Sequence, residues 1–213
     1  MGLFDRIATR KNEPDTQGAT ATGDDAVFGT KALRKFLSCL TSRESPVLLD
    51  LGPVVGSNVS FFGEQLGCKI FVEDIFADID RHVRDGKLED LPAFLKKRFA
   101  INDGTVDGIL CWDAVDFLDR PAAQELATQL TRVLRPDGAL LCFFASTTTR
   151  DTKYTKFIIV DEVNLRHRSY PALRARQTAL LNRDIIRMFA GLRVSDSFLL
   201  QNNLREVLFR KPA

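Results

Sequence analysis

Apolar runs and amphipathic stretches alternate along this chain from about residue 30 to its end. Leu33, Phe36, Leu37 and Leu40 recur at the spacing of one helical face. The short runs that follow are almost wholly apolar, as expected of strands buried on both faces of a sheet. Alternation of this kind is typical of parallel strands joined by crossover helices.

The same pattern predicts the individual elements. We expect strands at 47–51, 69–73, 106–111 and 139–144, and helices at about 57–66, across 76–98 and at 121–134. Near the end, "NRDIIRMFAGL" has helical spacing, and two short strand patterns follow it, separated by "QNN". The chain is therefore predicted to form a mostly parallel α/β sheet that ends in an antiparallel hairpin.

Residues 1–28 are expected to form a flexible leader before one domain over residues 29–213. The run "RKNEPDTQGATATGDDA" has no large apolar residue with which to join a core. The preceding "GLFDRI" could form one amphipathic turn that docks on the domain, a partner or a membrane surface.

Composition limits the possible partners. The net charge of +2 and the pI near 8.4 do not indicate nucleic-acid binding. Four widely spaced cysteines indicate no metal site, and no apolar run has the length of a membrane span. We therefore expect a cytoplasmic protein without a metal.

Several strings fall at the joints of the predicted elements. They are "VLLDLGPVVG", "VEDI", "TVDGILCWDAVDFL" and "RVLRPDGALLCFF". In this order they resemble the class I S-adenosylmethionine-dependent methyltransferases, over roughly residues 30–213. The resemblance implies a Rossmann-like, doubly wound, mostly parallel sheet with a C-terminal antiparallel hairpin and helices on both faces. It also implies methyl transfer from S-adenosylmethionine to a small-molecule acceptor.

The resemblance also implies which residues bind the cofactor: Asp50, Gly52, Gly56, Glu73, Asp74, Trp112 and Asp113. Gly52 would let the backbone approach the donor closely, and an acid after the second strand would accept hydrogen bonds from the ribose hydroxyls. Counting from Gly56 favours Glu73 over Asp74 for this role, the alternative being an acid that caps a helix. Trp112 has an alternative role as a cap on the core.

Two departures from the family pattern stand out. Val54 stands at the middle glycine position of the first motif and Pro53 beside it lacks an amide donor, so the loop must follow another path or hold the cofactor less closely. This argues against a dinucleotide oxidoreductase, whose pyrophosphate needs the close amides, more than against a methyl donor, which has no phosphate. Ser57 and Asn58 offer further side-chain hydrogen bonds to a ligand at the start of the next helix, although we expect them to cap that helix. The second departure is that no third strand is found between Asp74 and Val106.

The sequence assigns no catalytic residue, since both His82 and His167 are expected to be solvated. Residues 146–176, after the fourth predicted strand, carry seven basic and three acidic side chains with interleaved aromatic ones. They could form a substrate-covering insertion for an anionic acceptor, or a solvated charged face. The main alternative to an enzyme is a catalytically inactive relative that serves as a binding or assembly module.

Overall fold

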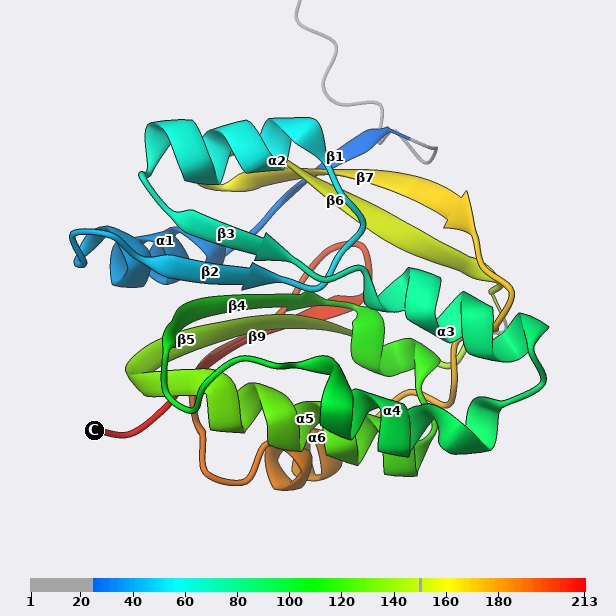
Figure 1. Ribbon diagram of the computed structural model, residues 1–213. Helices are drawn as coiled ribbons and strands as arrows, with labels where there is room; N and C mark the ends of the chain where they lie inside the picture. The colour runs from blue at the N-terminus through cyan, green and yellow to red at the C-terminus, as the bar shows by residue number, and fades with distance from the viewer. Residues whose placement is uncertain (1–24, 150) are drawn as a thin grey trace, which may run out of the picture.

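The computed structural model of the protein describes residues 25–149 and 151–213 and contains two sheets (Figure 1). The larger sheet has six strands in the order β3-β2-β4-β5-β9-β8, and the smaller has three in the order β1-β7-β6. The strands of the larger sheet are β2 (Val47–Asp50), β3 (Lys69–Val72), β4 (Val106–Trp112), β5 (Leu134–Ala145), β8 (Arg193–Leu199) and β9 (Leu204–Arg210). Those of the smaller sheet are β1 (Ala26–Gly29), β6 (Lys153–Asp161) and β7 (Asn164–Pro171).

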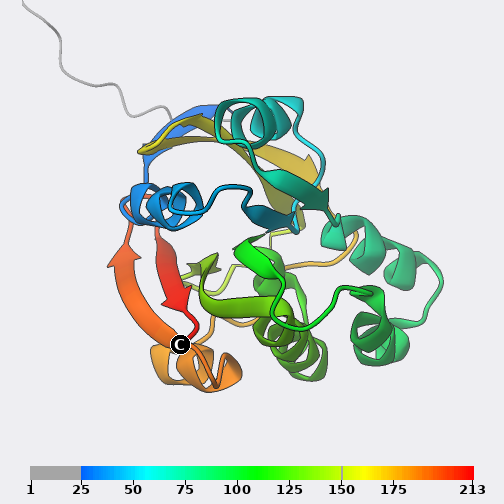
Figure 2. The same ribbon diagram turned by 60° about the vertical axis from the view of Figure 1, so that its left-hand side comes forward.

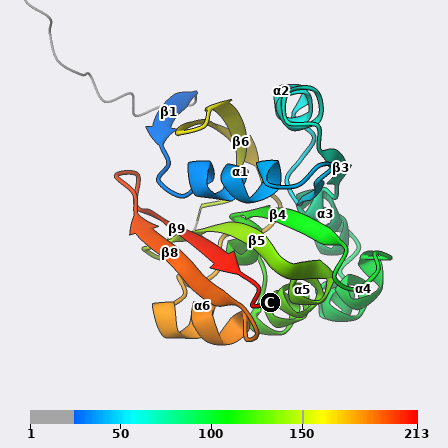
Figure 3. The same cartoon turned by 90° about the vertical axis from the view of Figure 1, so that its left-hand side faces the viewer.

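Helices cover both faces of the larger sheet. They are α1 (Leu33–Thr41), α2 (Gly56–Ser60), a π-helical turn (Phe61–Gln65), α3 (Ile75–Arg84), α4 (Leu91–Arg98), α5 (Arg120–Val133) and α6 (Asn182–Met188), with 3₁₀ turns at Leu88–Asp90 and Ala114–Phe117. Figure 3 shows α4, α5 and α6 on one side of the sheet, and α1 with the smaller sheet on the other. In Figure 2 the smaller sheet lies beside α2. Each face has its own cluster of buried apolar side chains.

The local sequence explains the main elements. All four apolar residues predicted for the first helix are buried in α1. Every residue of β4 is buried, Asp107 included, as expected for a central parallel strand whose other side chains are mostly apolar. Helix α5 begins where Asp119 accepts a hydrogen bond from the backbone N–H of Ala122 at 3.0 Å.

The predicted strands are confirmed: β2, β3, β4 and β5 are parallel, and β8 and β9 form the antiparallel C-terminal hairpin. The described residues between 75 and 105 form helices rather than a third strand, in agreement with the departure seen in the sequence. The leader predicted over residues 1–28 is too long, because residues 26–28 belong to β1, which pairs with β7. The "GLFDRI" segment lies outside the described residues.

Residues 153–171 form β6 and β7, so most of the predicted insertion is a β-hairpin. All four cysteines are free, and three of them are buried. Among the described residues, the helices are too short or too polar to cross a membrane.

Candidate ligand-binding site

The order of the central strands places a crevice at one edge of the sheet. From β2 the chain moves outward to β3 and then returns to β4 on the opposite side of β2. In open parallel sheets, ligands bind at such a reversal, outside the carboxyl ends of the two strands beside it. Asp50 ends β2, Gly52 begins the loop after it, and Trp112 ends β4. These three predicted residues therefore lie together.

The side chain of Trp112 reaches from the end of β4 to the loop after β2. Its indole Nε1 donates a hydrogen bond to Oδ1 of Asp50 at 2.6 Å, and the backbone N–H of Gly52 donates to the same oxygen at 2.9 Å. A Cβ added to Gly52 would lie 2.8 Å from Cδ1 of the indole. The indole thus fills the space that Gly52 leaves free.

Asp50 is enclosed by these contacts. Burial raises the pKa of Asp50 to about 6, while the hydrogen bonds from Gly52 and Trp112 oppose the rise and the carboxylate of Asp74 adds to it. Because Oδ1 already accepts two hydrogen bonds from the chain itself, a ligand amine would compete with the indole for this oxygen.

Aromatic rings hold the indole from the other side. The ring of Phe157, on β6, stacks on Trp112 with a centroid distance of 5.0 Å and an interplanar angle of 4°. Phe143, on β5, lies parallel at 6.1 Å. Trp112 is only 3% exposed, as expected if it caps the core. Its contact with a donor stays a prediction. The sequence places Phe157 among the aromatic residues of the 146–176 insertion, but no local spacing predicts that it reaches across to Trp112.

Strand β6 is fixed to the start of α2 by Asn58. The Asn58 side chain donates to the carbonyl of Phe157 at 2.8 Å and accepts from the backbone N–H of Ile159 at 2.9 Å. The capping role expected for Ser57 or Asn58 is wrong, because Val55 is the N-cap residue and no side chain caps this helix. The amide of Asn58 satisfies the backbone of β6 instead.

Further along the glycine loop, Val54 and Gly56 are exposed to solvent. Val54 is 65% exposed, and nothing lies within 4 Å of a Cβ added to Gly56. Val54 is not among the residues with positive φ, so the loop does not follow the path that a glycine there would permit. The space beside the α-carbon of Gly52 is therefore occupied, whereas the space beside the α-carbon of Gly56 is open.

The two acids after β3 have different roles. The backbone N–H of Glu73 donates to the carbonyl of Asp50 at 2.7 Å, which places Glu73 next to the crevice. Its partly exposed carboxylate pairs with Arg98 of α4. Asp74 is the N-cap of α3 and accepts from the backbone N–H of Ala77 at 3.1 Å. Of the two, Glu73 is the one free of a capping role.

Asp113 lies in a buried cluster of charges. It is fully buried and pairs with Arg176, which also donates to Oδ2 of Asp116 at 2.7 Å. The backbone N–H of Ala145 donates to this same Oδ2 at 2.7 Å. Burial raises the pKa of Asp116 to about 7, and the Arg176 charge opposes the rise. The sequence placed Arg176 in a lid or on a solvated face, and nothing in its spacing predicts this pairing.

A cavity of about 300 Å³ lies beside this cluster. It is lined by Asp116, by the first turn of α5, by the loop at Gln177 and by Arg187 of α6. Acidic, basic and apolar side chains all contribute to its wall. The space can therefore admit a small molecule with both polar and apolar parts.

The expectation that both histidines are solvated is corrected, because His82 is buried and His167 is only partly exposed. His82 is 8% exposed, and its Nδ1 lies 2.7 Å from the carbonyl oxygen of Asp78. His167 lies between the rings of Phe28 and Phe157, and burial lowers its pKa to about 4. In the ranges 25–149 and 151–213, no group of His, Cys, Asp or Glu side chains is arranged to hold a metal ion.

Comparisons with known proteins identify the fold. No protein family matches the sequence, and no curated protein is similar to it. The CcbJ methyltransferase from Streptomyces caelestis is 13% identical, over 85% of this chain and 95% of that one, with a TM-score of 0.50. The [4+2]-cyclase SpnF is 12% identical, over 85% and 80%, with a TM-score of 0.51. A methyltransferase from Burkholderia thailandensis with bound S-adenosylhomocysteine is 16% identical, over 85% and 79%, with a TM-score of 0.46.

At this level of identity the likeness shows the fold alone. The chain has the Rossmann-like fold of the class I S-adenosylmethionine-dependent methyltransferases, as the sequence predicts. One neighbour is described as a cyclase, so this fold is not restricted to methyl transfer.

Proposed function

We propose that this chain binds S-adenosylmethionine at the carboxyl edge of β2 and β3 and transfers its methyl group to a small acceptor. The observation that carries the proposal is the strand order, which brings the Asp50–Gly56 loop to the point of reversal where open sheets bind ligands, with Glu73 next to it at the end of β3. Bound there, the donor would supply an electrophilic methyl group. Glu73 would accept hydrogen bonds from the ribose hydroxyls of the donor. Asp50 and Gly52 would lie beside its methionine part.

The residue types at this edge fit the donor, but the space does not fit it everywhere. A carboxylate can accept hydrogen bonds from ribose hydroxyls, a second can meet the donor's amine, and a glycine loop lets the backbone approach the ligand closely. Gly56 is open, whereas the indole of Trp112 covers Gly52 and holds the acceptor oxygen of Asp50. A donor can therefore occupy the whole crevice only when Trp112 has moved.

We place the acceptor in the cavity beside Asp116, at the end of the element that follows β4. Strand β6 covers this edge of the sheet, which supports a substrate-covering role for residues 146–176. An anionic acceptor has less support, because Arg168, Arg174 and Arg176 all form ion pairs with acids of the chain.

The filled space at Gly52 favours a second candidate, a methyltransferase-fold module without catalysis. In that case the Trp112 contacts would be permanent parts of the core, and the protein would act by binding a partner or a small molecule elsewhere. The two candidates differ in whether the crevice admits the donor at all.

Titration calorimetry with S-adenosylmethionine and S-adenosylhomocysteine separates the two candidates. We expect both to bind, and Glu73→Ala to weaken binding by about 1–3 kcal/mol, as for loss of a charged hydrogen-bond acceptor. Asp74→Ala is the matched control, because it removes a helix cap and should lower stability with little change in affinity. If the folded protein binds neither ligand at millimolar concentration, the non-catalytic candidate holds.

A further inference from the structure

The crevice at the strand reversal is closed by the single tryptophan of the chain. The indole of Trp112 joins the ends of β4 and β2 through its hydrogen bond to Asp50, and its edge lies against the α-carbon of Gly52. A ligand entering between the two strands would meet the indole first. The side chain thus blocks the place where the fold binds its ligands.

The backbone at Trp112 is irregular. Its φ is 51°, in the left-handed region that an aromatic residue rarely adopts. The pairing of β4 with β5 also shifts register between Leu110 and Trp112. Bulges and positive φ values direct a side chain away from the regular path of a strand and are frequent at functional sites. The blocking position is therefore a strained one that the contacts around the indole must maintain.

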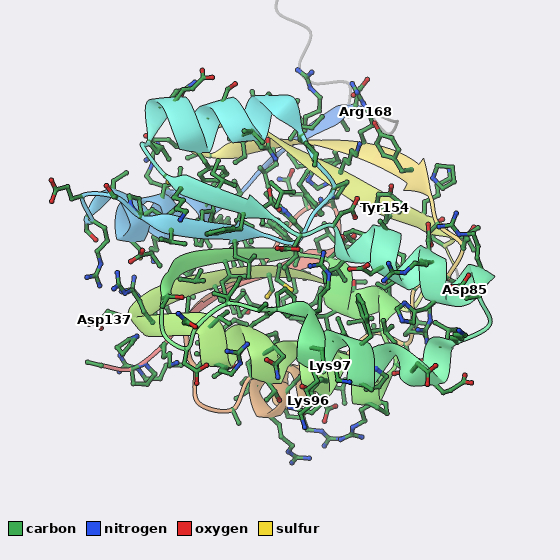
Figure 4. The ribbon with its side chains drawn as sticks, viewed as in Figure 1. Asp85, Lys96, Lys97, Asp137, Tyr154 and Arg168 are labelled. Atoms are coloured by element: carbon green, nitrogen blue, oxygen red, sulfur yellow. The ribbon has the colours of Figure 1, made fainter. Side chains whose placement is uncertain are left out.

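Asp50 at the end of β2 and Phe143 of β5 supply contacts from within the larger sheet, and one further contact comes from β6, a strand of the smaller sheet. Phe157 stacks on the indole, and Asn58 ties the backbone of β6 to α2. Tyr154, labelled in Figure 4, stacks on Phe76 of α3 at 4.7 Å and anchors the other end of the strand. The position of Trp112 is thus coupled to the position of β6.

We propose that Trp112 and β6 together form a gate over the crevice, and that a ligand reaches Asp50 and Gly52 only when the indole leaves them. The inference rests on the proposed function for the identity of the ligand. The closed state combines the hydrogen bond to Asp50, the parallel rings of Phe157 and Phe143 and a strained backbone, so displacement of the indole relaxes the backbone while it breaks these contacts. Binding and indole displacement are then one coupled event.

Because Trp112 is the sole tryptophan, its fluorescence reports on the gate directly. S-adenosylhomocysteine is the probe, since it is not consumed. We expect its addition to the full chain to move the emission to longer wavelength and to increase quenching by acrylamide, as the buried indole becomes exposed. Calorimetry on the same samples measures binding independently of fluorescence.

Variants test the gate from the affinity side. Trp112→Ala removes the block and should bind S-adenosylhomocysteine about 10-fold or more tightly than the wild type, because the cost of opening is gone. Phe157→Leu keeps the reporter, loosens the stack, and should redden the emission before any ligand is added. Phe189→Leu is the matched control, because this buried ring packs on Phe209 away from the crevice and should leave affinity unchanged.

The outcomes separate the gate from the function it rests on. Binding without any change in Trp112 emission or quenching would overturn the gate and leave the proposed function standing. Weaker binding by Trp112→Ala, with Phe157→Leu unchanged, would also overturn it and make Trp112 a ligand contact. If the wild type and both opened variants fail to bind while folded, the gate and the proposed function fail together.

Discussion

Replacing Asp50 by Asn should change how the stability of the fold depends on pH. Burial raises the pKa of Asp50 to about 6, whereas an Asp in an unfolded chain titrates near ~3.9. A carboxyl whose pKa is higher in the folded state adds stability below the unfolded value, and this stability is lost as the pH rises through the folded value. The contribution of Asp50 is therefore present below about pH 4 and lost as the pH rises through about 6.

The size of the effect follows from the shift. About two pKa units correspond to ~3 kcal/mol in the free energy of unfolding. Asp50 is 5% exposed, so solvent screens this little. In Asp50→Asn the amide Oδ1 still accepts from Gly52 and Trp112, but the side chain stays neutral. Part of this is lost already below pH 4, so the stability of the wild type relative to Asp50→Asn should fall by about 2 kcal/mol between pH 4 and pH 7.

Urea unfolding, followed by circular dichroism from pH 4 to pH 7, measures this difference. Other titrating groups, such as Asp116 and His167, are present in both proteins and cancel. Asp85→Asn controls for the loss of a charge, because Asp85 is exposed at the end of α3 (Figure 4). A stability difference between wild type and Asp50→Asn that stays constant over this range would refute the argument that burial governs Asp50.

Further substitutions test the packing of the site. Gly52→Ala should lower the free energy of unfolding by about 1–3 kcal/mol, because its Cβ would lie 2.8 Å from the indole. Gly56→Ala, with nothing within 4 Å of its Cβ, should be neutral or stabilise by up to ~1 kcal/mol, and equal losses in urea unfolding would contradict this contrast. Arg176→Met should cost about 3–5 kcal/mol at pH 7, because two buried carboxylates lose their cation. This loss should shrink toward pH 5 as those carboxyls take up protons, and a loss independent of pH would show that charge is not its cause.

Most of the fold is predictable because its signals are local. The buried face of α1 and the mostly apolar stretch of β4 each lie within one element, and short connections then restrict the topology. The absence of a strand between residues 75 and 105 could also be predicted, because most of that stretch has helical spacing. β1 was not predictable: its four residues adjoin a polar run, and its pairing with β7 depends on tertiary contact.

The site is predictable by residue type but not by contact. Asp50 and Gly52 lie where a strand meets a loop, which a sequence pattern can locate. The hydrogen bond from Asn58 to Phe157 joins residues 99 positions apart, and the ion pair of Arg176 with Asp113 joins residues 63 apart. Such contacts depend on how the β6–β7 hairpin lies over the sheet, and no spacing within one element reports that.

Gly52 itself can be explained without a bound ligand. A glycine directly after the first parallel strand is usually taken to allow close approach of a ligand. Here the indole of Trp112 makes the same demand, since an added Cβ would lie 2.8 Å and 2.9 Å from two of its atoms. Gly56 has no such neighbour, and Val54 is 65% exposed. Substitutions at Gly52 therefore report on the packing of Trp112 whether or not a donor binds. A loss of affinity without a loss of stability at Gly56 is what would identify a ligand contact in this loop.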